Sequence, residues 1–143
     1  KTQTPLHRFR LALARKLKSC KLVDVYGSFD GGLRVQLSKT LTSYRFTFAI
    51  ENDQKPFFFT ERLTSCFASM TLPIYLGATK IEQYFNMDGI IQLKISDLDD
   101  IEKILQLCTP AEYERRLPAI IDNYNRAKAF LNANDWLYNN YLK

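Results

Sequence analysis

A strand–loop–helix–strand pattern over residues 44–77 constrains the fold of this chain more than any other feature. Residues 44–50 are rich in aromatic and β-branched side chains of alternating apolar character, which predicts a strand. Thr60 can cap a following helix, because apolar residues then recur at helical spacing. These residues are Leu63, Cys66, Phe67 and Met70. The apolar run 72–76 stops at Gly77, as a buried parallel strand does. The loop at 51–56 therefore opens at the carboxyl edge of the predicted sheet, where open α/β sheets bind ligands.

The elements predicted on either side of this unit continue the alternation of helices and strands. Apolar spacing predicts an amphipathic helix over residues 5–19, and residues 22–26 (LVDVY) are predicted to form a short strand. A short helix is expected near residues 39–42, another after Gly77, and a strand over residues 90–95. This alternation predicts an α/β fold with a mostly parallel sheet and helices on both faces.

The last third of the chain is predicted to be helical. Ser96 is expected to cap a helix over residues 97–108, and the threonine–proline pair at 109–110 begins another. Pro118 is expected to bend or restart that helix. The tail at residues 134–142 is predicted to form a last helix.

Length and composition place the chain among ordinary globular domains. Its 143 residues are 46% hydrophobic and 24% charged, which predicts one domain. No apolar run approaches the roughly 18 residues of a membrane span. Cys20, Cys66 and Cys108 show no metal-binding spacing, so reduced and mostly buried thiols are expected. The single histidine, His7, has no obvious partner for a catalytic triad.

The net charge of +5 is concentrated at the start of the chain. Residues 1–21 contain no acidic residue. Their basic residues are Lys1, Arg8, Arg10, Arg15, Lys16, Lys18 and Lys21. Such local basic character favours a phosphate-bearing ligand or an acidic partner over a broad nucleic-acid surface. Arg15, Lys16 and Lys18 are expected to form a solvated face. A nucleic-acid binder is not favoured, because exposed aromatic residues do not interleave with these charges.

The residues of the central unit resemble the donor-binding core of the α1,3/4-fucosyltransferase family, which transfers fucose from GDP-fucose. The matching residues are Glu51-Asn52 at the strand end, Phe58, Thr60-Glu61-Arg62 at the helix start and residues 73–77 (PIYLG). Residues 23–27 (VDVYG) are similar to a Val-Asp-x-x-Gly step that precedes this core in the family. The resemblance spans about residues 8–95.

The resemblance implies one half of a two-Rossmann-domain (GT-B) architecture. Residues 1–143 would form a single Rossmann-like donor-binding domain, the C-terminal half, with a helical tail. The glycan acceptor would be held by a separate domain, to which nothing in these residues corresponds. Eukaryotic members are Golgi proteins with one membrane span. Because no membrane span is predicted in this sequence, we expect a cytoplasmic bacterial or viral enzyme, or a Golgi-lumenal location if the sequence is a trimmed eukaryotic chain.

The resemblance also implies which residues bind the donor. Arg62 stands where the family has a lysine that binds the phosphates, and arginine replaces a point charge with a planar fork. Glu61 matches a glutamate expected at the ribose. Arg10 has the spacing of an arginine used on the donor phosphate, and the alternative register uses Arg8. A solvated surface charge would also explain Arg62 and Arg10, and compensation of the dipole at the helix start would also explain Glu61.

The remaining candidate residues surround the same loop. Phe58 replaces a tyrosine of the family, so its ring is kept and the hydroxyl is missing. Thr60 belongs to the same motif. Glu51 and Asn52 either hold the sugar or order the loop. The catalytic base has no matching position, although Glu51 or Asp53 can be proposed from residue type.

No metal or other cofactor is expected. Residues 44–77 contain no Asp-x-Asp motif of the kind that bridges a divalent ion to the donor. The acidic residues Asp97, Asp99 and Asp100 are explained by the positive end of the predicted helix, which they offset by about 0.3–1 kcal/mol each. The leading hypothesis is the donor half of an inverting α1,3-fucosyltransferase-like enzyme. The alternative is a non-catalytic nucleotide- or glycan-binding domain in an assembly.

Overall fold

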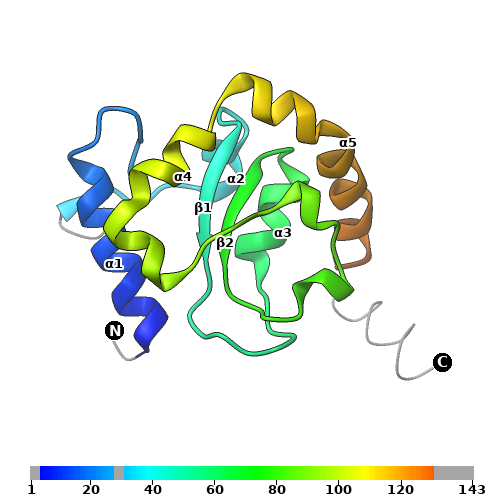
Figure 1. Cartoon of the computed structure of the whole chain (residues 1–143), viewed down its shortest axis with the longest axis horizontal. Coiled ribbons are helices and arrows are strands. Elements are labelled where there is room, and N and C mark those ends of the chain that lie inside the picture. Colours follow the sequence, from blue (N-terminus) through cyan, green and yellow to red (C-terminus); the bar gives the residue numbers. More distant parts are fainter. Residues whose placement is uncertain (1–3, 28–30, 131–143) are drawn as a thin grey trace.

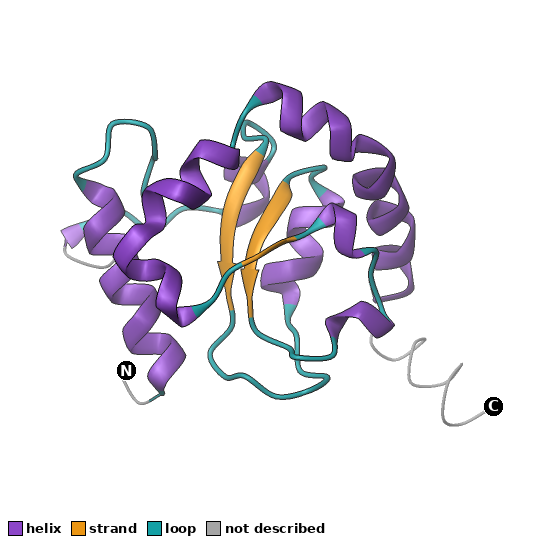
Figure 2. Cartoon of the chain, in the orientation of Figure 1, coloured by secondary structure: helices purple, strands orange, loops and turns teal. Residues whose placement is uncertain are grey.

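The computed structural model describes residues 4–27 and 31–130, which form a three-stranded sheet packed between helices (Figures 1 and 2). The α-helices are α1 (Pro5–Lys18), α2 (Leu37–Leu41), α3 (Glu61–Ala68), α4 (Ile101–Leu107) and α5 (Pro110–Ala127). The strands are β1 (Phe46–Ile50), β2 (Leu72–Leu76) and β3 (Ile91–Gln92). Short 3-10 helices are η2 (Ile81–Gln83), η3 (Met87–Gly89), η4 (Ile95–Asp100) and η5 (Lys128–Phe130). The predicted helix at 134–142 lies outside the described residues.

The sheet is parallel, as predicted, with strand order β1-β2-β3. β1 pairs with β2 from Phe46 opposite Leu72 to Ile50 opposite Leu76. All five residues of β2 are buried, which explains its continuous apolar sequence. The β-loop-α-β unit that the sequence predicts between residues 44 and 77 is confirmed.

Helices cover both faces of the sheet and make two apolar cores. On one face, α1 contributes four residues at helical spacing, joined by Ile101 of α4 and Ile120 of α5. The α1 residues are Leu6, Phe9, Leu13 and Leu17. On the other face, Leu63 and Phe67 of α3 pack with Tyr75 of β2. Side chains of β2 alternate between the two cores, as the period of a strand requires.

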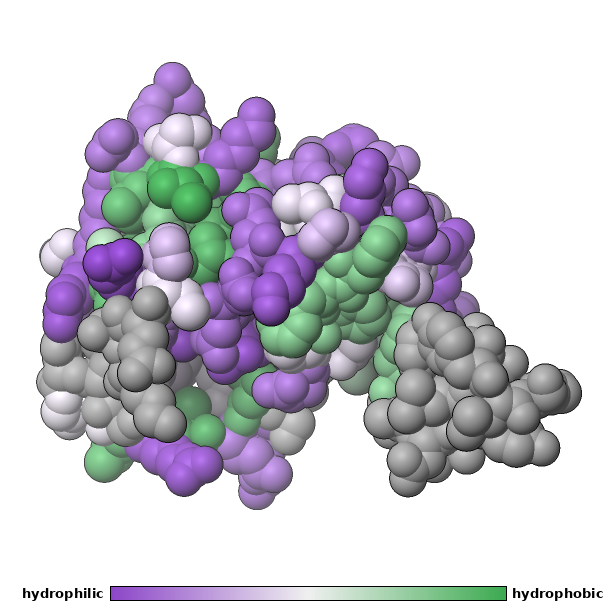
Figure 3. Space-filling model, turned by 90° about the horizontal axis from the view of Figure 1, so that it is seen from below, coloured by the Kyte–Doolittle hydropathy of each residue, from purple (hydrophilic) through white to green (hydrophobic). Residues whose placement is uncertain are grey.

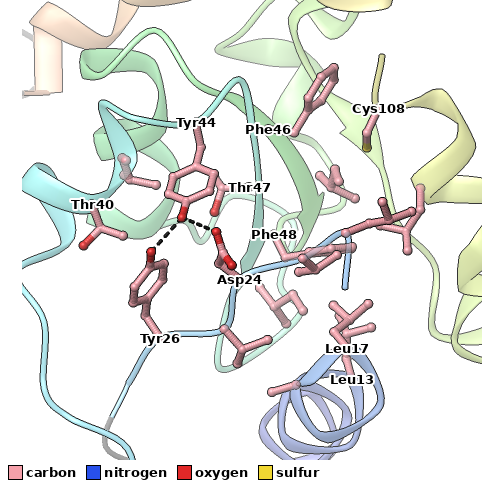
Figure 4. Close-up of a pocket in the computed structure, with 18 of the residues that line it drawn as sticks. Leu13, Leu17, Asp24, Tyr26, Thr40, Tyr44, Phe46, Thr47, Phe48 and Cys108 are labelled. Atoms are coloured by element: carbon pink, nitrogen blue, oxygen red, sulfur yellow. Dashed lines mark hydrogen bonds between the residues drawn. The ribbon is translucent and has the colours of Figure 1, made fainter. Parts of the chain in front are cut away.

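The predicted strand at 22–26 is wrong, because no backbone ladder joins these residues to β1. Side-chain bonds hold the segment instead: the Tyr44 hydroxyl donates to Asp24 and lies 2.6 Å from that of Tyr26 (Figure 4). Val23 and Val25 still pack against the first core. This segment and β1 both line a cavity of about 450 Å³.

The prediction of a strand over residues 90–95 is correct in place but too long. Only Ile91–Gln92 pair with β2, and Leu93 N adds a bond to Tyr75 O at 2.8 Å. The strand ends because Lys94 N donates to Asp97 Oδ2 at 2.7 Å and turns the chain into η4.

The predicted cap at Ser96 is wrong for the same reason. Ser96 lies inside η4, and the helix predicted over 97–108 is divided into η4 and α4. In contrast, Thr109 caps α5 as predicted and accepts a bond from Glu112 N at 3.1 Å.

Helix α5 continues through Pro118, so the predicted restart is wrong, whereas its ribbon changes direction partway along its length, as the predicted bend requires (Figure 1). Tertiary bonds hold the turns beyond the proline. Buried Asn123 accepts from Asn86 N at 2.7 Å and donates to Asn86 O at 2.9 Å. This pair fixes α5 against η3 and offsets the backbone bond that proline cannot make.

The three cysteines are free thiols, and Cys66 is buried in the second core. Burial raises the pKa of Cys66 to about 12, so this thiol stays protonated at neutral pH. None of the helices within residues 4–27 and 31–130 is long and apolar enough to cross a membrane.

Candidate functional site

The candidate site lies at the carboxyl edge of the sheet, where β1 ends and α3 begins. The strands point to the lower side of the molecule in Figure 1, and the loop between β1 and α3 lies along that side. Ligands of open parallel sheets bind at this edge because the loops diverge there and helix N-termini face it. The structure brings the predicted residues of the loop, α1 and α3 to this one edge.

Glu51 joins the two ends of the loop between β1 and α3. Its side chain is fully buried, and its backbone N–H donates to Leu76 O at 2.9 Å. Glu51 Oε1 accepts from Thr60 N at 2.8 Å, and Oε2 accepts from Thr60 Oγ1 at 2.7 Å. One carboxylate therefore ties the end of β1 to the start of α3.

Thr60 begins α3 as the sequence predicts. Its hydroxyl oxygen accepts from Arg62 N at 3.2 Å, which satisfies one of the free amide groups at the helix N-terminus. Arg62 Nη1 lies 3.4 Å from Thr60 Oγ1 and 3.8 Å from Glu51 Oε2. The Arg62 side chain is 33% exposed, so its guanidinium is anchored on one side and open to solvent on the other. Glu61, the first residue of α3, is exposed beside it.

Arg10 reaches the same edge from α1. Its Nη1 donates to Asn52 Oδ1 at 3.0 Å and to Ile50 O at 3.3 Å. Burial lowers the pKa of Arg10, the nearby charge of Arg62 lowers it further, and Glu51 opposes both effects. The positive charges of the two arginines therefore repel each other. Glu51, which lies between them in the sequence, is a buried anion that opposes this repulsion at Arg10.

Sequence analysis did not identify His7 as a neighbour of the candidate site, because the spacing of residues along the chain indicates no partner for it. Burial lowers the pKa of His7, and the charges of Arg10 and Arg62 lower it further. This lowered pKa favours the neutral imidazole at pH 7. The only sequence signal is its position one helical turn before Arg10 on α1.

The aromatic residues after the loop divide into exposed and buried rings. Phe57 and Phe58 are 53% and 41% exposed, whereas Phe59 packs against Tyr84 and Phe85. Backbone bonds from Thr79 N and Lys80 N to the carbonyls of residues 55 and 56 hold this part of the loop. Figure 3, seen from below, shows apolar surface between hydrophilic areas on this side of the molecule. Phe58 therefore offers a partly exposed ring in the loop that joins β1 to α3.

The cavity beside β1 is not this site. Its lining is mostly apolar, with Leu13 and Leu17 of α1 and Phe46 and Phe48 of β1 (Figure 4). Arg10 borders it, but Glu51, Glu61 and Arg62 do not. An apolar lining of this kind does not suit a diphosphate. Metal binding has no support in the described part of the chain, where no three His, Cys, Asp or Glu side chains cluster suitably.

Comparison with known proteins gives one match. The family model described as "Glycosyltransferase family 10 (fucosyltransferase) C-term" matches residues 2–114. The match extends from α1 into α5 and includes every candidate residue at the carboxyl edge. No curated protein and no solved structure matches the chain significantly.

Proposed function

Because the chain belongs to glycosyltransferase family 10, the fucosyltransferases, as its C-terminal domain, we propose that it binds GDP-fucose or a related GDP-sugar. It would act as the donor half of an inverting α1,3-fucosyltransferase-like enzyme. A nucleotide-sugar donor follows from the family, and the arrangement of charges at the carboxyl edge supports the choice of a diphosphate.

The observation that carries the proposal is the convergence of Arg10 and Arg62 on one sheet edge. Arg10 is fixed at the end of β1, and Arg62 is fixed in the first turn of α3. Burial lowers the pKa of Arg10, and the positive charge of Arg62 lowers it further, as repulsion between two guanidiniums requires. A diphosphate with about two negative charges would relieve this repulsion and accept bonds from the N-terminus of α3.

The remaining parts of a GDP-sugar have chemically suitable neighbours. The carboxylate of Glu61 is exposed at the start of α3 and can accept bonds from ribose hydroxyls. The open ring of Phe58 provides an apolar surface for the base. Asn52 keeps its amide nitrogen available for the sugar while its Oδ1 accepts from Arg10.

The proposed reaction is an inverting displacement. A carboxylate base takes the proton of the acceptor hydroxyl, whose oxygen attacks the sugar carbon while the GDP diphosphate leaves with the bond electrons. Arg10 and Arg62 would stabilise the charge that develops on the leaving diphosphate. The base and the acceptor site would come from a separate acceptor domain.

Calorimetric titration tests the proposal directly. GDP and GDP-fucose should bind, UDP should bind more weakly, and a short DNA should not bind. Affinity should be unchanged in EDTA, because the described residues offer protein cations rather than a metal site. Arg115→Ala on α5 is a matched control, because Arg115 pairs with Glu112 away from the site. Loss of binding in EDTA, or preference for UDP, would reject the proposal.

A further inference from the structure

We propose that Glu51 is a positioning residue that acts on the donor through Arg62 and does not touch the donor itself. This inference rests on the proposed function, because it takes Arg62 as a contact to the diphosphate. It gives Glu51 a different role from sugar binding or proton transfer, both of which its residue type and location would otherwise suggest.

Burial shows why Glu51 has no face to offer a ligand. The side chain is fully buried, and both oxygens already accept bonds from Thr60, through its N–H and its hydroxyl. A buried carboxylate needs such compensation, because removing one from water without partners is strongly unfavourable. The carboxylate also forms an ion pair with Arg62, whose Nη1 lies 3.8 Å from Oε2.

Packing prevents the carboxylate from swinging toward the solvent. A Cβ atom added at Gly77 would lie 2.5 Å from Glu51 Cγ and 2.4 Å from the Tyr75 hydroxyl oxygen. That hydroxyl accepts a bond from Ala78 N at 3.0 Å, so it is fixed in turn. The stem of Glu51 is therefore held between the turn after β2 and the cap of α3.

The negative charge of the fixed Glu51 carboxylate explains its proposed role. Arg10 and Arg62 repel each other, and the negative charge of Glu51 opposes that repulsion at Arg10. The same carboxylate anchors Thr60, on which Arg62 rests. Glu51 therefore sets where α3 begins and where the Arg62 guanidinium points, so the donor meets a cation that is already ordered.

A double-mutant cycle separates this role from direct contact. In Glu51→Gln the amide can still accept from Thr60 N and donate to Thr60 Oγ1. The negative charge near Arg62 and Arg10 is lost, and so is the acceptor of the Thr60 hydroxyl proton. We expect GDP affinity to fall about threefold to tenfold, the range for ordering one long side chain. The melting temperature should stay close to that of the wild type. In the Arg62→Ala background, Glu51→Gln should have a clearly smaller effect on GDP affinity, because only its influence on Arg10 remains.

Two outcomes of the cycle would overturn the proposal. An equal loss in both backgrounds would show that Glu51 contacts the donor or acts independently of Arg62. Unchanged or tighter binding by Glu51→Gln would show that its charge does not order Arg62. Glu102→Gln, an exposed change on α4, controls for the loss of one negative charge.

A measurement without nucleotide keeps this inference distinct from the proposed function. With ¹⁵N-labelled arginine, the Arg62 Nε–H signal, assigned through Arg62→Lys, reports how well the side chain is ordered. We expect lower order in Glu51→Gln and no change in Glu102→Gln. If the wild type fails to bind GDP, the proposed function fails, and this signal still decides the role of Glu51. Equal order in Glu51→Gln and wild type would overturn the positioning role.

Discussion

The guanidinium of Arg10 spans from α1 to the end of β1, where its Nη1 lies 3.0 Å from Asn52 Oδ1. The same Nη1 is 3.3 Å from Ile50 O, so one side chain covers the last carbonyl of the strand. The hydroxyl of Thr4, the cap of α1, also donates to Asn52 O. The first helix is thus joined to the loop that holds the candidate donor contacts.

We predict that Arg10→Ala weakens GDP binding by about 1.5–3 kcal/mol, the range for a hydrogen bond to a charged group. Calorimetry with GDP measures the loss. Arg8→Ala is the matched control, because Arg8 is exposed on the same helix and represents the alternative register of the family motif. A loss in Arg8→Ala with normal binding by Arg10→Ala would transfer the role to Arg8.

We predict a similar loss of about 1.5–3 kcal/mol in GDP affinity for Arg62→Ala, with little change in melting temperature. The side chain is one-third exposed and its removal leaves no cavity in the core, so stability should be retained. Arg62→Lys should keep most of the affinity, because the family carries lysine at this position. Unfolding of Arg62→Ala, with normal affinity in the folded fraction, would make Arg62 structural.

The unit from β1 to β2 could be predicted because its signals are local. The cap at Thr60, the apolar spacing from Leu63 to Phe67 and the break at Gly77 each act over a few residues. The strand predicted at 22–26 fails because a strand needs a partner edge, and the pattern of valines does not specify one. In the structure, hydrogen bonds of the Tyr44 side chain hold this segment instead of a strand ladder.

The candidate site could likewise be predicted only in part. Residue types and a family resemblance were enough to name Arg10, Glu51 and Arg62, and the structure brings all three to one edge. Their contact with a donor remains a prediction. The burial of Glu51 depends on how the turn after β2 and the cap of α3 enclose it, and the placement of His7 near the arginines depends on how α1 packs on the sheet. Such long-range contacts leave no periodic signal in a single sequence.

We predict that Gly77→Ala destabilises the protein by about 1–3 kcal/mol, the usual cost of overpacking. The new Cβ would approach the Tyr75 hydroxyl to 2.4 Å and Glu51 Cγ to 2.5 Å. Denaturant unfolding measures the loss. Tyr75→Phe removes the nearest atom and leaves Tyr75 Cζ at 2.6 Å, so the double variant should lose somewhat less stability than the two single variants together. Additive losses would show that the hydroxyl oxygen is not what the new Cβ displaces.

The pH dependence of stability should reveal the ion pairs of Glu112 on α5. Bonds from Arg115 and Arg116 lower the pKa of Glu112 to about 2. A carboxylate with a lowered pKa in the folded state stabilises the protein above its unfolded pKa of about 4.3. That contribution is lost as pH falls toward 2. Glu112→Gln should therefore lower the melting temperature at pH 7, and the difference from wild type should vanish near pH 2. Glu114→Gln on the same helix is the control, and a difference independent of pH would contradict the prediction.

We predict that these 143 residues bind the donor without transferring its sugar. Transfer requires a base that reaches an acceptor held about 3–3.5 Å from the sugar carbon. Glu51 cannot reach an acceptor, because it is buried with both oxygens bonded to Thr60. Asp53 is bound by Lys55 at 3.3 Å and stands in an exposed loop that does not exclude water. The measurement is a transfer and donor-hydrolysis assay with acceptors that end in GlcNAc or galactose. Turnover well above the uncatalysed rate, abolished by Asp53→Asn and retained by Lys55→Ala, would place the base within this loop and contradict the prediction.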